Sequence, residues 1–549
     1  MSQKLPLHYT FRSVVSDQHT AARAYFLCVL GLVLIESLLR LPGWIQHMRK
    51  PGFVSRRRRN HWTPRVWLHK LLTHPSPAPF ITDHHAASIL RCLAFIGLNI
   101  LFGWGRLRFT TDYQRFGWMT IANAGLALLL PTRNNIFSLV ARIPSPVLLM
   151  YHRWAGVATV VHATLHFGLT AERYVHGEQF NVVVQNARIR VGIMAWAALV
   201  IVFVTSLRIL RRRAFELFYL THFLFIVFVA GALYHASAGP EFLLPGLCLW
   251  LVDRAWRLCS NFGPGRALTV QSVTRHHAGD VVKLQVSGVT TKYPAQMAWI
   301  QLPSVSVLAW HPFTIASAPG EQTATIAIRA LGRYTKRAQN LDASCDMSTT
   351  KGHAGAHGYD QPRMRLDGPF GVGNPRWTQY PAVALMAGGI GITPAISIAT
   401  HIVKEALRLG HAGGRRQVYL LWSVSDRRHL SWFEDELMRI SEVVSRPNVP
   451  VSVNITIHVT KGSRAEVLSG QEEQGVGIAD GMYKGPGKIY EGRPDVVQWL
   501  RQVQQATVGS DIAVSVCGPR SLKNDVRRAA VSLSSDKGLF VVEEEVFEL

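Results

Sequence analysis

The sequence has no pair of cysteines at metal-binding or redox spacing. Its six cysteines are scattered over 549 residues without a CxxC pair, which argues against a disulfide framework and a cysteine-based zinc site. No secretory signal pattern is present, because the first apolar run begins near residue 24 and no small-residue cleavage site stands out. Acidic residues are also few, 34 against 59 Lys and Arg, so the formal net charge is +25.

This excess of positive charge is compatible with nucleic acid, but its distribution favours a membrane. Lys and Arg gather beside apolar stretches, as in RKPGFVSRRRR at 49–59 and RILRRR at 208–213. Basic loops next to apolar spans are typical of the cytosolic side of membrane proteins, where they also meet anionic lipid headgroups. We therefore expect membrane lipid as a partner and no nucleic acid.

Several apolar stretches approach the roughly 20 residues that cross a bilayer. The seven predicted spans are 21–41, 86–105, 114–131, 147–169, 191–207, 215–235 and 242–259. With the N-terminus outside, more Lys and Arg fall in the inner loops, so the positive-inside rule favours that orientation. An odd number of spans then places everything after residue 260 in the cytosol.

The second half of the chain changes pattern twice. From 262 to about 375, alternating runs such as DVVKLQVSGV are separated by turn residues, which predicts an antiparallel β-barrel. From about 381, apolar strands alternate with helical segments, which predicts a parallel, doubly wound sheet. The Gly-rich and polar stretches 343–363 and 464–494 are interpreted as surface insertions, with His353 and His357 as solvated loop residues.

Two of the apolar stretches carry spaced histidines, which are unfavourable in hydrocarbon unless they are paired or bind a ligand. His152 and His166 lie 14 residues apart, about 40° apart around an ideal helix and roughly 21 Å apart along it. His222 and His235 match this axial spacing, so His152 can face His222 and His166 can face His235. Two such pairs stacked across a bilayer fit two b-type haems.

The haem interpretation has a bundle-core alternative, in which these histidines are hydrogen-bonded polar residues. The matched axial spacing favours haem. However, a separation of 13 residues on an ideal helix places His222 and His235 about 140° apart around the helix axis. The 215–235 span therefore requires a bulge or a kink to bring both rings to one face. His162 lies off the ligand face and is interpreted as a packing residue or a hydrogen-bond donor.

Two motifs in the predicted barrel have flavin-binding chemistry. HPFTIAS, at 311–317, ends a strand and offers two hydroxyls, two flat rings and a proline that fixes the turn. In the following IAIRALGRYTKRA, Arg329 and Thr335 can meet a pyrophosphate. Each motif taken alone is also compatible with an ordinary strand and turn.

Three features of the predicted parallel sheet suit a dinucleotide. MAGGIGITPAIS, at 386–397, is a Gly-rich turn between a strand and a helix, where the backbone can approach a phosphate. VSVCGPRS ends a later strand and places residues 517–519 at the carboxyl edge, where such sheets bind ligands. Arg427 and Arg428 follow another strand and are placed to meet a 2′-phosphate, although a solvated charge pair is the alternative.

Taken in order, these motifs resemble those of the fungal ferric-chelate reductase family, which shares its core with the NADPH oxidases. The motifs that carry the resemblance are HPFTIAS, LDGPFG (366–371), AGGIGITP, EGRPD (491–495), CGP and the terminal EEEVFEL. They follow a helical bundle with spaced histidine pairs, and the resemblance covers about residues 86–549. The extra first span resembles the reductases. The 13-residue histidine spacing is like that of the oxidases, and LGRYT replaces a more usual Gly-Gly-aromatic-Thr.

The resemblance implies two b-type haems, FAD and NADPH. The implied haem ligands are His152, His166, His222 and His235. The candidate FAD residues are His311, Pro312, Phe313, Thr314, Ile315, Ala316, Ser317, Arg329 and Thr335. The candidate NADPH residues are Gly388, Gly389, Ile390, Gly391, Ile392, Thr393, Pro394, Arg427, Arg428, Cys517, Gly518 and Pro519. In such proteins the penultimate aromatic region lies near the flavin, and Phe547 and Cys517 are the catalytic candidates.

We therefore expect a multi-pass helical membrane bundle followed by a ferredoxin-reductase-like module. The expected parts are a tail, extra span and basic inner loop (1–85), a six-span haem domain (86–260), a FAD-binding barrel (262–375) and an NADPH-binding α/β domain (376–549).

The expected activity is electron transfer from cytosolic NADPH through FAD and haem to a ferric or cupric chelate outside, supporting metal uptake at the plasma membrane. A superoxide-producing NADPH oxidase and a redox-inactive scaffold are the alternatives. Glu172, His176 and Glu178, in the outer segment 170–190, are candidates to contact the chelate. The preferred metal and the oligomeric state stay open.

Overall fold

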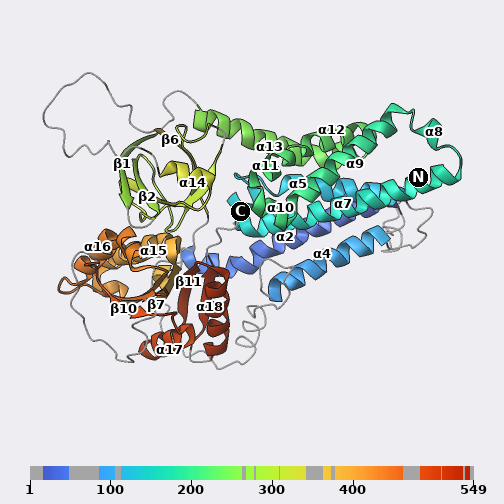
Figure 1. Cartoon of the computed structure of the whole chain (residues 1–549). Helices are drawn as coiled ribbons and strands as arrows, with labels where there is room; N and C mark the ends of the chain where they lie inside the picture. Colours follow the sequence, from blue (N-terminus) through green and yellow to red (C-terminus); the bar gives the residue numbers. More distant parts are fainter. Residues whose placement is uncertain are drawn as a thin grey trace, which may run out of the picture. The chain divides into compact units, whose positions relative to one another are not determined.

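The computed structural model divides the chain into two compact units, Met1–Pro42 with Ser88–Trp256 and Gly43–Ala87 with Arg257–Leu549. The first unit is helical, and the second contains two β-sheets (Figure 1). The structure describes residues 17–48, 86–104, 113–141, 143–262, 268–276, 280–307, 309–339, 341, 363–371, 377–461, 483–507, 510–535 and 538–544. His353, His357 and Phe547 lie outside the described residues.

Helices occupy the apolar stretches that the sequence predicts as spans. The long helices are α2 (Gln18–Met48), α4 (Ala86–Trp104), α5 (Tyr113–Leu129), α7 (Ser145–His176), α9 (Ala187–Ser206), the pair α11 (Phe215–His222) and α12 (Phe225–His235), and α13 (Gly239–Phe262). The short helices are α6 (Ile136–Leu139), α8 (Phe180–Val183) and α10 (Arg208–Arg213). A proline in the first turn of α7 suits its start, since no intrahelical hydrogen bond is lost there.

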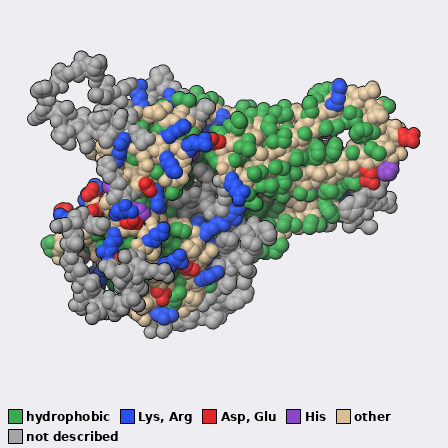
Figure 2. Space-filling model, viewed as in Figure 1, with side chains coloured by type: hydrophobic (Ala, Val, Ile, Leu, Met, Phe, Trp, Pro, Cys, Tyr) green, Lys and Arg blue, Asp and Glu red, His purple; other side chains and the backbone are tan. Residues whose placement is uncertain are grey.

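The outside of this helical unit is apolar. Leu27, Leu93 and Val252 are 66%, 60% and 64% exposed, and Figure 2 shows hydrophobic side chains over much of the visible helical surface. Extended apolar surface of this kind is typical of a membrane-facing protein. Within the described residues, Gln18–Leu38, Ala187–Ser206 and Phe215–His235 are long and apolar enough to cross a membrane, and Ser88–Trp104 is a shorter apolar helix. The count of seven spans stays a prediction.

The span that carries His222 and His235 is broken, as the 13-residue spacing requires. α11 ends at His222 and α12 begins at Phe225, and the two residues between them form a tight turn with right-handed helical backbone angles. The amide of Leu224 donates to the carbonyl of Thr221, which tightens the chain at this point. The change of helical phase brings both histidines to the same side, which confirms the predicted kink.

The first part of the second unit is an antiparallel β-barrel. Its strands are β1 (Leu268–His276), β2 (Val281–Ser287), β3 (Met297–Gln301), β4 (His311–Thr314), β5 (Thr323–Arg329) and β6 (Arg363–Phe370), in the order β4-β3-β6-β1-β2-β5. A bridge between Ile315 and Ile326 joins the two ends of this order and closes the barrel. Alternate apolar residues fill the interior, including Val282, Leu284 and Val286 on β2. The predicted barrel is confirmed.

The second part is a parallel sheet with helices on both faces. Its strands are β7 (Ala382–Gly388), β8 (Arg416–Val424), β9 (Val451–Val459), β10 (Lys488–Glu491), β11 (Ile512–Cys517) and β12 (Phe540–Glu544), in the order β10-β9-β8-β7-β11-β12. The covering helices are α15 (Ile392–Leu409), α16 (Glu434–Val444), α17 (Val496–Ala506) and α18 (Arg520–Leu533). The order reverses at β7, so the Gly-rich turn lies at the switch point where such sheets bind nucleotides.

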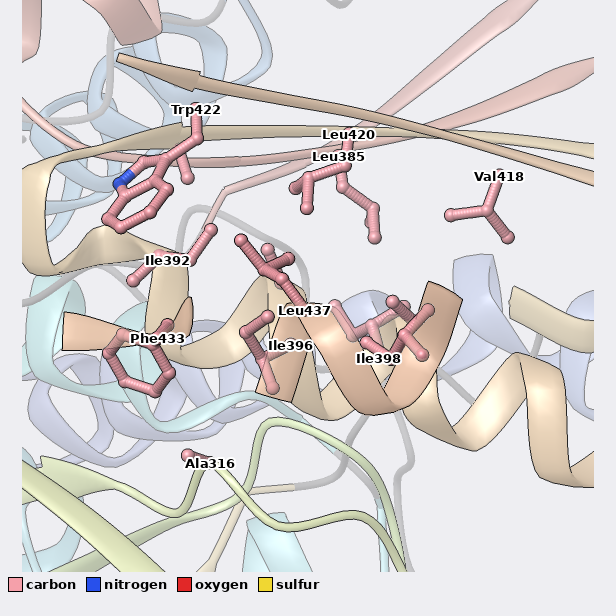
Figure 3. Close-up of a cluster of buried hydrophobic side chains, with 14 of the residues drawn as sticks. Ala316, Leu385, Ile392, Ile396, Ile398, Val418, Leu420, Trp422, Phe433 and Leu437 are labelled. Carbon is pink, nitrogen blue, oxygen red and sulfur yellow. The ribbon is translucent and has the colours of Figure 1, made fainter. Parts of the chain in front are cut away.

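Strand β7 shows why this sheet is doubly covered. Val383, Leu385 and Ala387 belong to the core packed under α15 and α16, whereas Ala384 and Met386 belong to the core under α17 and α18. Adjacent residues of a strand point to opposite faces, so an unbroken apolar run requires cover on both sides. Figure 3 shows the first core, with strand residues such as Leu385 and Leu420 facing Ile396 and Leu437.

One prediction about the surface insertions is wrong in part. The sequence predicts an insertion over the whole of 464–494, but residues 488–491 form β10, the edge strand beside β9. All four side chains of β10 are exposed, because the strand lies at the edge of the sheet and no helix covers it. A strand of four residues whose side chains are all exposed is too short to show an alternating apolar pattern, and its sequence therefore resembles that of a loop.

The barrel and the parallel sheet share a buried contact within the second unit. Lys283 of β2 binds Glu436 of α16 at 2.8 Å, and its ammonium lies 4.5 Å from the centre of the Phe433 ring. The two charged side chains are only 7% and 13% exposed. A second contact places the Arg329 guanidinium 5.1 Å from the centre of the Trp432 ring.

We predict that Lys283→Met destabilises this unit by about 3 kcal/mol, because it leaves a largely buried carboxylate without its ion-pair partner. Glu436 would then face Arg439 at 3.7 Å, too long for a hydrogen bond. Glu321→Gln is the matched control, since the Lys404–Glu321 pair is 43% and 32% exposed and such pairs contribute about 1 kcal/mol or less. Urea unfolding of the purified protein, followed by flavin fluorescence, measures both. An equal loss of unfolding free energy in Lys283→Met and Glu321→Gln would show that the buried pair contributes no more to stability than the exposed one.

Candidate functional site

The four histidines form two facing pairs. The ring centres of His152 on α7 and His222 on α11 lie 6.2 Å apart, and those of His166 on α7 and His235 on α12 lie 6.3 Å apart. Since α7 is continuous from Ser145 to His176, the 14-residue spacing puts the two pairs roughly 21 Å apart along its axis. The structure therefore brings together the residues that the sequence paired.

Backbone carbonyls fix the tautomer of three of these rings. Nδ1 lies 2.7–2.9 Å from a carbonyl oxygen in each case: His152 with Ala127, His166 with Tyr113, and His235 with Arg188. A carbonyl oxygen can only accept, so Nδ1 donates its hydrogen and the Nε2 lone pair is left free for a metal. Nδ1 of His222 is buried without a hydrogen-bond partner among the described residues.

The spacing within each pair fits an iron atom between the rings. A metal–imidazole bond is about 2 Å and the ring centre lies about 1 Å beyond the nitrogen, so two imidazoles on one metal have centres about 6 Å apart. Within the described residues, no group of three or more His, Cys, Asp or Glu side chains could hold a metal ion. Two imidazoles alone are an incomplete site, but they suffice for haem, whose macrocycle supplies the other ligands.

Two glycines allow neighbouring helices to approach the ligand rings. A Cβ on Gly192 of α9 would stand 2.5 Å from Nδ1 of His235, closer than any real contact. A Cβ on Gly117 of α5 would stand 3.2 Å from Cε1 of His166. Small residues at these positions permit the close helix packing that lets backbone carbonyls reach the rings.

His162 takes no part in either pair. It is buried, and its Nε2 lies 3.2 Å from Oδ1 of Asn99 on α4. Asn99 in turn donates to Tyr25 of α2, at 2.9 Å, and accepts from Asn123 of α5, at 3.0 Å. The expected packing and hydrogen-bonding role of His162 is confirmed, and this polar network connects α2 to the histidine-bearing helix.

The HPFTIAS motif lies on β4 and the turn that follows it. His311, Pro312 and Phe313 are half-buried, whereas residues 314–317 are buried. The Ser317 hydroxyl accepts from the amide of Thr325, and its carbonyl accepts from Ser397 of α15 at 2.9 Å. The open half of the motif is therefore 311–313, and the buried half anchors the barrel to the helix after the Gly-rich turn.

Of the two expected pyrophosphate contacts, Arg329 is available and Thr335 is already occupied. The Arg329 Nε is buried without a hydrogen-bond partner among the described residues, and Nη1 lies 3.3 Å from where a Cβ on Gly389 would stand. A half-buried guanidinium with one unsatisfied nitrogen, beside a Gly-rich turn, fits an anionic group such as a pyrophosphate. In contrast, Thr335 accepts from the amides of Leu331 and Gly332 and so caps α14 (Arg333–Ala338).

The Gly-rich turn and the CGP segment lie against each other at the carboxyl edge of the sheet. A Cβ on Gly388 would stand 2.6 Å from Cδ of Pro519, and one on Gly391 would stand 2.9 Å from Sγ of Cys517. Gly389 has φ +57°, a conformation that favours glycine. The turn leads through a short 3₁₀ segment into α15, whose N-terminus favours a phosphate. The sequence-predicted NADPH residues 388–394 and 517–519 are thus brought together.

Arg427 and Arg428 also lie at this carboxyl edge, immediately after β8, but both are paired with carboxylates. Arg427 binds Glu491 at 2.6 Å and Arg428 binds Asp426 at 2.7 Å. The Arg428 guanidinium and amide lower the pKa of Asp426 to about 2. With side chains 55% and 61% exposed, both arginines can meet a ligand from solution.

The expected chelate contacts near the end of α7 do not form a metal site. Glu172 and His176 belong to α7, which extends seven residues past the predicted span, and Glu178 follows it with φ +56°. These three residues are not a metal-binding group, since the described residues contain none. The last residues of α7 are polar, so they do not continue the apolar pattern by which a membrane span is recognised in the sequence. That pattern therefore predicts a loop where the helix in fact continues.

Family models match the chain one after another from residue 116 to residue 531. The ferric reductase like transmembrane component matches residues 116–233, the FAD-binding domain 266–374, and the ferric reductase NAD binding domain 380–531. The chain belongs to the ferric reductase family, with the NADPH oxidases as relatives. Membership of the ferric reductase family and the fold class are thereby confirmed, and so are a transmembrane component and domains for FAD and NAD(P)H. A fungal origin and a preference for ferric chelates stay predictions.

Individual relatives of this ferric reductase-family chain are distant. Human NADPH oxidase 3 is 24% identical over 63% of this chain and 66% of its own length. Dual oxidase 2 of Rattus norvegicus is 26% identical over 74% of this chain and 28% of its own length. The chain thus spans at most about two thirds of these curated relatives. Among solved structures, ferredoxin NADP+ reductase from Neisseria gonorrhoeae is 14% identical, with a TM-score of 0.34, over 51% of this chain and 97% of that chain.

Several residues around the histidine pairs could not be predicted from the sequence. Gly117 and Gly192 lie in apolar helices, where nothing in the pattern marks them as neighbours of His166 and His235. The backbone carbonyls that accept hydrogen bonds from His152, His166 and His235 cannot be recognised from the sequence, because every residue type has a backbone carbonyl. Trp432 had a weak signal, as an aromatic residue in the segment that follows β8 and begins with Arg427.

We predict that His235→Ala and Gly192→Ala each remove the haem at the His166–His235 pair and leave the other. The first deletes a ligand, and the second inserts a methyl group where the His235 ring stands. A reduced-minus-oxidised spectrum should show about half of the haem of the wild type, while NADPH still reduces the flavin. Gly97→Ala is the control, because nothing lies within 4 Å of its added Cβ. Full haem content in His235→Ala would refute the ligand assignment.

Proposed function

We propose that this protein carries electrons from NADPH through FAD and two b-type haems across a membrane to a metal chelate on the other side. The observation that carries the proposal is the pair of facing histidine couples, with ring centres 6.2 and 6.3 Å apart, in one chain with FAD and NAD(P)H domains. When bound, FAD accepts a hydride and returns its electrons singly, as haem iron requires.

The protein's own residues arrange this path in two places. At the sheet edge, the glycines of 388–391 allow a dinucleotide to approach the backbone, and Arg329 stands beside them from the barrel. In the helical unit, α7 supplies one ligand at each of two levels, and α11 and α12 supply the opposite ligands. With the expected orientation, His152 and His222 hold the inner haem and His166 and His235 the outer one.

A ferric or cupric chelate is the acceptor that we propose. It is supported by the family models, two of which bear the name of ferric reductases. It is also supported by the exposed residues 175–182, which lie at and after the carboxyl end of α7, the end nearer to His166. Release of iron or copper in its reduced form would then support metal uptake at the plasma membrane.

A superoxide-producing oxidase is the second candidate. It is favoured by relatives such as the superoxide-generating NADPH oxidase heavy chain of Dictyostelium discoideum, which is 25% identical over 62% of this chain and 66% of its own length. In that reaction O₂ takes the electron at the outer haem.

The acceptor can be decided with purified protein in vesicles supplied with NADPH. We predict that a ferric chelate accelerates NADPH oxidation, and that its reduction continues without O₂ and in the presence of superoxide dismutase. Superoxide release in proportion to NADPH consumption, with no acceleration by ferric or cupric chelates, would instead establish the oxidase.

We further predict that Arg427 and Arg428 favour NADPH over NADH by contacting the 2′-phosphate, which guanidinium groups bind with charge-assisted hydrogen bonds. Replacing both with Ala should raise the apparent KM for NADPH by about tenfold, the effect of losing one or two such bonds, and barely change that for NADH. Initial rates with both nucleotides measure this. Equal losses for NADPH and NADH would show that the arginines have another role.

A further inference from the structure

The two arginines at the sheet edge differ in how they are held. Arg428 and Asp426 are two residues apart, and Asp426 also accepts the Arg428 amide at 2.9 Å, which begins the 3₁₀ segment Arg427–Trp432. This pair shapes a turn of the backbone. Arg427 instead reaches Glu491, 64 residues away, with Nε at 2.9 Å and Nη2 at 2.6 Å from the same carboxylate oxygen.

The sheet register explains why Glu491 meets Arg427. Val424, the last residue of β8, pairs with Val459 of β9, and Val459 pairs with Glu491 of β10. These residues form one row at the carboxyl edge, where parallel sheets bind dinucleotides. The next row inward runs from Gly388 of the Gly-rich turn through Ser423 and His458 to Tyr490. Arg427 and Glu491 therefore lie along the same edge as the Gly-rich turn.

The two charges favour different nucleotides at this position. A guanidinium favours the 2′-phosphate of NADPH, whereas a carboxylate accepts the ribose 2′-hydroxyl of NADH and repels a phosphate. Any 2′-phosphate that binds Arg427 must compete with Glu491 for the same donors. The pair is exposed, with side chains 55% and 35% accessible, and exposed ion pairs are weak enough to be exchanged.

We propose that Glu491 is a specificity-determining residue, which occupies Arg427 in the absence of nucleotide and thereby limits the preference for NADPH over NADH. This inference rests on the proposed use of a nicotinamide nucleotide at the carboxyl edge. Glu491 acts through Arg427 and through its own charge, and it takes no part in the hydride transfer.

The test compares Glu491→Gln with the wild type in the full-length protein. Binding of adenosine 2′,5′-bisphosphate and of 5′-AMP is measured by calorimetry, and KM is measured for NADPH and NADH. Glu491→Gln should bind the bisphosphate about two- to fivefold more tightly, the range expected from releasing an exposed ion pair. The KM for NADPH should fall by a similar factor, whereas binding of 5′-AMP should not improve and the KM for NADH should stay equal or rise.

Glu405→Gln is the matched control, because Glu405 of α15 is also partly exposed and also pairs with an exposed arginine, Arg408. It makes the same change of charge and should leave the nucleotide preference unchanged. In an Arg427→Gln background, Glu491→Gln should lose most of its effect on the bisphosphate.

The inference would be overturned if Glu491→Gln left the ratio of the KM values for NADPH and NADH unchanged. It would also be overturned if Glu405→Gln changed that ratio by the same factor. A wild type that oxidises neither nucleotide would instead refute the proposed function. The binding measurements separate the two failures, since they do not depend on turnover.

Discussion

Two imidazoles held at a fixed separation, in a helical bundle with an apolar exterior, are the constraint on which the rest of this molecule depends. Ring centres 6.2 and 6.3 Å apart leave room for one metal atom and for nothing larger along that axis. Three features of the bundle maintain the spacing: carbonyls of neighbouring helices orient the rings, the break between α11 and α12 corrects the helical phase, and Gly192 lets α9 approach His235.

The carboxy-terminal unit has a different organising constraint, the row of strand ends at the carboxyl edge of its parallel sheet. Gly388 and Gly391 can pack closely against Pro519 and Cys517 because glycine has no Cβ; a Cβ at either position would collide with its neighbour. This contact brings two distant motifs into one site. The barrel meets the same edge through Arg329, whose Nη1 lies beside Gly389 and whose Nε has no hydrogen-bond partner among the described residues. The buried Lys283–Glu436 pair joins β2 of the barrel to α16 beside the sheet and stabilises the contact between these two parts.

Much of this could be predicted from the sequence, because periodicity and spacing report directly on helix faces and strand faces. The histidine pairing, the kink, the barrel and the parallel sheet all follow from such patterns, and the structure confirms them. The edge strand β10, the length of α7 and the cap made by Thr335 could not be predicted, since they depend on polar residues whose partners are distant or backbone groups. The ion pair between Arg427 and Glu491 likewise depends on the register of three strands.

The most direct test of the haem assignment is the haem content and ligation of the purified wild-type protein. Pyridine haemochrome analysis gives the number of b-type haems per chain, and low-temperature electron paramagnetic resonance of the oxidised protein reports the axial ligands. We predict two haems per chain, both low-spin with two imidazoles on each iron. A single haem, no haem, or a high-spin iron with one axial ligand would contradict it.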